Sequence, residues 1–140
     1  MSIVLHGVAA GKGIAIGHAH LITRGTTEVP QYDIDPDKLD AEVARFDNAI
    51  KATRKELEQL RGAIPENAPT ELGAFISLHL MLLTDVTLSR EPIDILREQK
   101  INAEWALKLQ SDKLAAQFDS IDDDYLRERK QDMLQVVRRI

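Results

Sequence analysis

The chain has 140 residues, no cysteine and a formal net charge of −5 at pH 7, which fits about one domain and excludes disulfides and thiolate metal sites. The acidic balance without a basic stripe argues against a nucleic-acid partner and favours a basic protein partner. No apolar run reaches membrane-span length and no secretory signal is visible, so no membrane association and a cytoplasmic location are expected.

The stretch GVAAGKGIAIG, residues 7–17, has the four glycines and the lysine of a phosphate-binding loop. Its spacing excludes a P-loop, because three residues rather than four precede the Gly-Lys pair and Gly13 follows Lys12 in place of Ser or Thr. The alternating Ile, Ala and His that follow predict extended chain, whereas a dinucleotide fingerprint opens onto a helix. Residues 1–24 are therefore predicted to be a β segment, and nucleotide binding remains a rival hypothesis.

Residues 25–34 form a polar connector, and a first helix is predicted to start at Asp35, a good N-cap, with Pro36 in its first turn. Gly62 is expected to end this helix as its C′ residue. Apolar residues recur along it in alternating steps of four and three, a heptad seam that requires an antiparallel partner helix. The seam consists of Leu39, Val43, Phe46, Ile50, Thr53, Leu57 and Leu60.

A second helix is predicted from Thr70–Glu71 onward, through the unusually apolar stretch AFISLHLMLLTD. At about 100° per residue its apolar arc spans roughly 200°, about twice the width that one core needs. This helix is therefore either sandwiched inside the fold or carries a face for another protein. One face holds Leu72, Ile76, Leu80 and Leu83; the second holds Phe75, Leu78 and Leu82, with His79 between the two and Met81 beyond them.

Further helices are predicted over LSREPIDILREQK, after Asn102 as an N-cap, and after the three aspartates at 122–124, which favour a helix N-terminus. The residues offer no catalytic arrangement of Ser, His and Asp. His18 and His20 share one side of a strand, but no third metal ligand follows at a recognisable spacing. His79 is interpreted as a packed, hydrogen-bonded histidine. These residues predict a helical binding module with a small β appendage.

Three stretches, LHLMLLTD, DDDYLRER and GVAAGKGIAIGHAHL, together resemble the N-terminal part of the phosphoenolpyruvate-protein phosphotransferase family, the Enzyme I of bacterial sugar phosphotransferase systems. The family typically shows G-x-x-x-S-x-G-I-A-x-G, H-x-M-L-L-x-D and D-x-Y-L-x-E-R. The resemblance covers the whole chain and departs at residues 11–13, where Ser-Pro-Gly is common. The nitrogen-regulatory paralogue usually carries a sensory domain before this region, and the pattern here begins at Met1, which disfavours it.

The resemblance implies a mainly α fold. Residues 35–140 would form a helical subdomain, a four-helix claw of two packed hairpins, joined by the connector at 25–34 to residues 1–24 of a split α/β phosphohistidine subdomain. It implies a transferase that passes a phosphoryl group to the phosphocarrier protein HPr in sugar uptake. The phosphohistidine signature G-G-x-x-S-H does not occur here. The family's phosphoenolpyruvate and Mg²⁺ site and its homodimer contact belong to a C-terminal domain. No catalytic residue, cofactor or metal ligand is expected in this chain, which should be inactive alone.

The resemblance also implies that the helical part docks HPr. Glu71 and Asp85 are expected to meet basic side chains of HPr. Four positions where relatives often carry acids hold Thr70, Ser77, Val86 and Thr87, which should slow association more than it changes geometry. The other positions that match the family's docking residues are Ala74, Phe75, Leu78, His79, Met81, Leu82, Leu88, Lys113, Phe118 and Arg129.

Structural roles remain open for several of these positions. Phe75 and Leu82 are also suited to a hairpin core, and Phe118 to covering a helix end. Arg129 can pair with Asp122 or Asp132 on its own helix. For the whole chain, the rival hypothesis from another class is a stand-alone dimerisation module that uses the long seam of the first helix.

Overall fold

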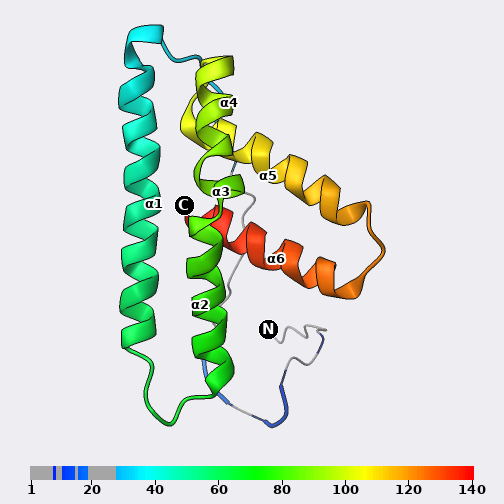
Figure 1. The fold of residues 1–140 in the computed structure, drawn as a ribbon. Helices are drawn as coiled ribbons and strands as arrows, with labels where there is room; N and C mark the ends of the chain where they lie inside the picture. The colour runs from blue at the N-terminus through cyan, green and yellow to red at the C-terminus, as the bar shows by residue number, and fades with distance from the viewer. Residues whose placement is uncertain (1–7, 9–10, 15, 19–27) are drawn as a thin grey trace, which may run out of the picture.

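The computed structural model describes residues 8, 11–14, 16–18 and 28–140, and every regular element in this part of the chain is helical (Figure 1). The predicted mainly α fold is confirmed, whereas most of the predicted β segment at 1–24 lies outside the described residues. In chain order the elements are the 3₁₀ turn η1 (Pro36–Lys38), α1 (Leu39–Gly62), α2 (Thr70–Thr84), α3 (Val86–Ser89), α4 (Glu91–Gln99), α5 (Ala103–Asp119) and α6 (Asp124–Arg139).

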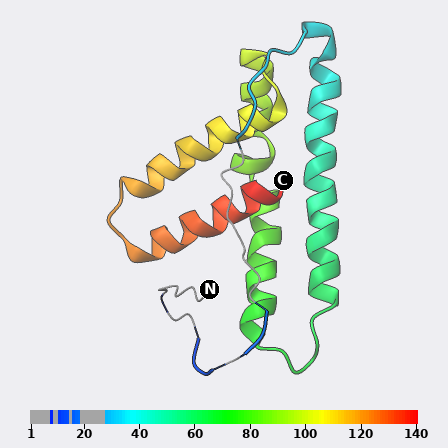
Figure 2. The same cartoon turned by 180° about the vertical axis from the view of Figure 1, so that it is seen from behind.

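The helices form two hairpins. The long helix α1 runs antiparallel to a column made of α2, α3 and α4, and the hairpin of α5 and α6 projects sideways from that column (Figures 1 and 2). The C-terminal end of α6 reaches the middle of the column, so the core lies where the two hairpins meet. Fully buried members of this core include Leu57, Leu83, Leu88, Leu96 and Val136.

Six of the seven seam positions of α1 are buried or half-buried, as predicted. Phe46, Ile50 and Leu57 belong to the core, and Thr53, the polar member of the seam, donates a hydrogen bond from Oγ1 to the carbonyl of Arg139 at 3.3 Å. The long seam is thus covered by other helices of the same chain. Leu60, in the last turn, is 44% exposed.

The limits of α1 differ in detail from the prediction. Asp35 and Pro36 begin the short 3₁₀ turn, and the α-helix itself starts at Leu39. Gly62 is the last helical residue rather than the C′ residue, because Ala63 follows in a right-handed conformation (φ −90°, ψ −2°) and its N–H still bonds to the carbonyls of the last turn. The helix therefore ends without the left-handed glycine that was expected.

In the described part of the chain, no single helix combines the length and apolar composition of a membrane span. The bent pair of Thr70–Thr84 with Val86–Gln99 does meet both criteria by length and composition alone.

Candidate protein-docking site

Helix α2 begins at Thr70, as predicted, and buries one narrow stripe. Ile76, His79 and Leu83 are the buried residues of this helix, and their spacing of three and four places them on one side, where α2 packs against α1 and α6 (Figure 1). The remaining circumference of this apolar helix is only partly covered.

The opposite side of α2 is a surface with apolar side chains. Phe75 is 41% exposed and Met81 is 59% exposed, whereas Leu78 and Leu82 are half-buried. Two exposed carboxylates, Glu71 and Asp85, lie near its ends. We call this surface the outer face of α2; it consists of Glu71, Ala74, Phe75, Leu78, Met81, Leu82 and Asp85, which recur at intervals of three and four residues.

The excess apolar arc predicted from the sequence is thus present, although its boundaries differ. Leu82 packs against the hydrophobic core at the edge of the outer face, so it serves both surfaces. Leu72, placed by its spacing beside Ile76, is 45% exposed. The reason is visible in Figure 1, where the first turn of α2 extends beyond the level at which α6 crosses the helix.

Two predicted docking residues are in the core. His79 is 3% exposed and Leu88 is 1% exposed, so neither presents its side chain to a partner. The ring of His79 lies against that of Phe75, with centroids 4.1 Å apart, and therefore supports the outer face from beneath. The predicted packing of this histidine is confirmed, but its Nε2 has no hydrogen-bond partner among the described residues. Burial lowers the pKa of His79 below its usual 6.5.

Asp85 separates α2 from α3 and caps the shorter helix. Its Oδ1 accepts hydrogen bonds from the backbone N–H of Thr87 at 2.8 Å and from the Thr87 hydroxyl at 2.6 Å. These bonds favour the charged form and lower the pKa of Asp85. The carboxylate therefore stays ionised at the exposed end of the outer face.

The second hairpin places the other predicted docking residues. Lys113 on α5 forms an ion pair with Glu91 at 3.5 Å, and Phe118 is half-buried against the core. Arg129 donates hydrogen bonds from Nε and Nη2 to the Tyr125 hydroxyl at 2.9 and 2.7 Å, and it does not pair with either aspartate considered from the sequence. Arg127 pairs with Asp122 and Asp124 instead. Arg129 therefore keeps an uncompensated positive charge within the described part of the chain.

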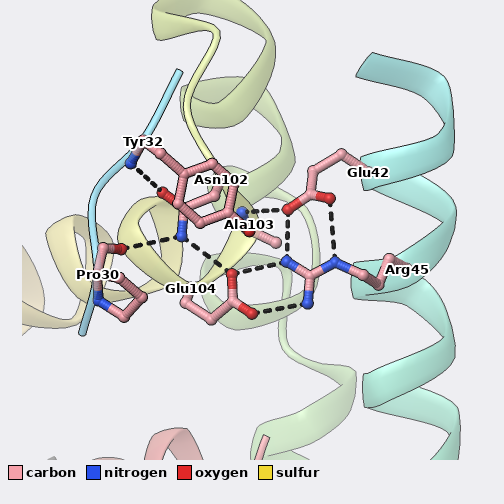
Figure 3. Close-up of polar contacts among 7 residues, drawn as sticks. All are labelled: Pro30, Tyr32, Glu42, Arg45, Asn102, Ala103 and Glu104. Atoms are coloured by element: carbon pink, nitrogen blue, oxygen red, sulfur yellow. Dashed lines mark hydrogen bonds and ion pairs between the residues drawn. The ribbon is translucent and has the colours of Figure 1, made fainter. Parts of the chain in front are cut away.

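A polar network at the start of α5 was not foreseen from the sequence (Figure 3). Asn102 occupies the predicted N-cap position, but its side chain makes no capping bond. Glu42 on α1 performs this role, since its Oε1 accepts the N–H of Ala103 at 2.8 Å. Arg45 binds both Glu42 and Glu104, and these hydrogen bonds lower the pKa of Glu42 and bring that of Glu104 to about 2. The (i, i+3) spacing of Glu42 and Arg45 could have predicted their ion pair, but it does not reveal that Glu104 joins it.

The described residues contain no group of three or more His, Asp or Glu side chains placed to hold a metal ion. His20, one of the two histidines considered from the sequence, lies outside the described residues. What the site offers is therefore a surface that is apolar along its length and acidic at both ends.

Known proteins share both the sequence and the fold. The family described as "PEP-utilising enzyme, N-terminal" matches residues 6–129. The chain is 49% identical over its full length to the phosphoenolpyruvate-protein phosphotransferase of Cupriavidus necator, covering 24% of that relative. It is 34% identical to the Bacillus subtilis protein of the same name, over 97% of this chain and 24% of the relative.

A solution structure of an Enzyme I protein superposes with a TM-score of 0.74 at 25% identity, covering 84% of this chain and 47% of that one. Among the curated relatives that it matches, the chain spans about a quarter of their length.

Proposed function

The chain belongs to the PEP-utilising enzyme family, of which it matches the N-terminal region, and on this premise we propose that it is the carrier-docking part of a phosphoenolpyruvate-protein phosphotransferase. In this proposal the outer face of α2 binds the phosphocarrier protein HPr. The names of the relatives from Cupriavidus necator and Bacillus subtilis support the enzyme class.

The observation that carries the proposal is the composition of the outer face. Single exposed apolar side chains are common on protein surfaces, but several that lie together on one helix indicate an interaction surface. Glu71 and Asp85 near its ends suit a partner whose rim is basic, because complementary charges speed association and fix orientation. Arg129, held by Tyr125 without a carboxylate, suits an anionic group on the same partner.

The role of such a face is to position the carrier. In the proposed reaction a P–N bond breaks at the enzyme's phosphohistidine and a new P–N bond forms at the histidine of HPr. Phosphoryl transfer depends on placing donor and acceptor in line, and correct placement can contribute about 7–11 kcal/mol to the barrier. In this proposal, the outer face of α2 contributes this placement.

For the complete enzyme, the proposal includes a cytoplasmic location, a homodimer and Mg²⁺ bound in a C-terminal part. The described residues do not fit a metal site. No step assigned to this chain therefore passes through Mg²⁺.

Isothermal titration of the chain with purified HPr, combined with sedimentation analysis, tests the proposal. We expect a 1:1 complex and a monomeric free chain, because the α1 seam that a dimerisation module would use is buried against other helices. Self-association without HPr binding would refute the docking proposal in favour of the dimerisation hypothesis. Control titration with ATP or NAD tests the nucleotide hypothesis in the same buffer.

A further inference from the structure

The connector before η1 is fastened to the turn between α4 and α5. Asp33 and Ile101 form an isolated antiparallel bridge. The backbone N–H of Ile34 donates to the carbonyl of Lys100 at 2.7 Å, and that of Asn102 donates to the carbonyl of Tyr32 at 3.1 Å. Lys100 adopts a left-handed conformation (φ 54°), which ends α4 and turns the chain toward the connector.

The side chain of Asn102 adds two bonds to this junction, and it is completely buried (Figure 3). Its Oδ1 accepts the N–H of Tyr32 at 3.1 Å, and its Nδ2 donates to the carbonyl of Pro30 at 3.0 Å. Asn102 thus holds the backbone on both sides of residue 31, although the two segments lie 70 residues apart in sequence.

The orientation of the Asn102 amide is fixed by Glu104. Nδ2 of Asn102 also donates to Glu104 Oε2 at 3.0 Å, and an ionised carboxylate only accepts hydrogen bonds, so the amide cannot reverse. Glu104 is in turn held by two bonds from Arg45, at 2.6 and 2.7 Å. Arg45 is held by Glu42, whose Oε1 also caps α5. The chain of contacts therefore ties the connector, α1 and α5 into one body.

We propose that Asn102 is a positioning residue for phosphoryl transfer: it fixes the described part of the connector, residues 28–34, against the helical body that docks the carrier. This inference rests on the proposed function. A carrier bound to α2 can receive a phosphoryl group only if the remainder of the enzyme approaches in one orientation. A displacement of about 1 Å can cost roughly 100-fold in rate. The connector leads toward that remainder of the enzyme, and Asn102 is its buried attachment to the helical body.

The test uses the complete phosphotransferase that carries this chain. We expect Asn102→Ala to lower kcat for transfer to HPr at least about tenfold, with KM for HPr unchanged within about twofold. A residue with a purely structural role would lower only the fraction of folded enzyme, so kcat normalised to the concentration of folded protein would stay unchanged. Arg97→Gln is the control, because it removes an exposed ion pair between α4 and α1, with Asp40 at 2.8 Å, and leaves the connector untouched.

A second variant changes the connector residue that bonds to Asn102. Tyr32→Pro removes the N–H that Oδ1 of Asn102 accepts, at a residue whose side chain is exposed, so the helical core is left intact. If circular dichroism shows that Asn102→Ala is unfolded, the kcat and KM of Tyr32→Pro test the inference instead. Unchanged kcat in the folded variants, or a rise in KM alone, would overturn the inference. Failure of HPr to bind the unaltered chain would instead refute the proposed function.

Discussion

Met81→Asp gives the sharpest test of the outer face. Met81 is 59% exposed, so more than half of its side chain is available to a partner. Full burial of a methionine contributes about 1.5–3 kcal/mol, and the exposed part can therefore contribute about 1–2 kcal/mol to docking. An aspartate enclosed by the interface without a partner costs about 1–3 kcal/mol more.

Together these terms predict a loss of about 2–5 kcal/mol, which is roughly 30-fold to several-thousand-fold in Kd. The fold should be little affected, because a largely exposed substitution changes the free energy of unfolding by about 0.5 kcal/mol or less. Isothermal titration with HPr measures the first quantity and urea unfolding the second.

Leu60→Asp is the matched control. Leu60 is 44% exposed in the last turn of α1 and is not part of the outer face, so the same change of chemistry should leave the Kd for HPr unaltered. If Met81→Asp binds HPr within threefold of the unaltered chain, or if both variants lose binding equally, the assignment of the docking face is refuted. Leu82→Asp is a poorer probe because Leu82 also packs against the core.

Two further predictions concern groups beneath and beside this face. Because burial lowers the pKa of His79, the unfolded chain binds a proton more readily than the folded chain does. The contribution of neutral His79 to stability should therefore be fully present above pH 6.5 and decline as the pH falls below it. His79→Leu should flatten that part of the curve of Tm against pH. A Tm that rises on acidification in this range, in the unaltered chain alone, would contradict this. Asp85→Ala removes the cap of α3 and should lower the free energy of unfolding, measured by urea denaturation, by about 1 kcal/mol. An unchanged free energy of unfolding would show that the cap does not stabilise the fold.

The features that depend on local chemistry were predictable from the sequence. The start of α2 at Thr70, the buried seam of α1 and the excess apolar circumference of α2 all follow from helix periodicity and from prolines that break helices. Each of these signals lies within one helix. Local sequence signals were therefore sufficient for these features.

Features that depend on a second helix were not predictable. His79 and Leu88 match docking positions by resemblance, yet the crossing of α6 and the break at Asp85 direct both into the core. Asn102 has the residue type of an N-cap, but Glu42 from α1 supplies the cap, which leaves the amide of Asn102 for the connector. A cap or a core position can be filled from a distant segment, and a single sequence does not show which segment that is.

The outer face of α2 can be tested most directly by amide chemical-shift mapping of the ¹⁵N-labelled chain during titration with unlabelled HPr. If this face binds HPr, the largest shifts fall along residues 71–85 and around Arg129, while the solvent-facing side of α1 stays unchanged. Saturating HPr with no shifts on α2, or with the largest shifts on α1, would contradict it.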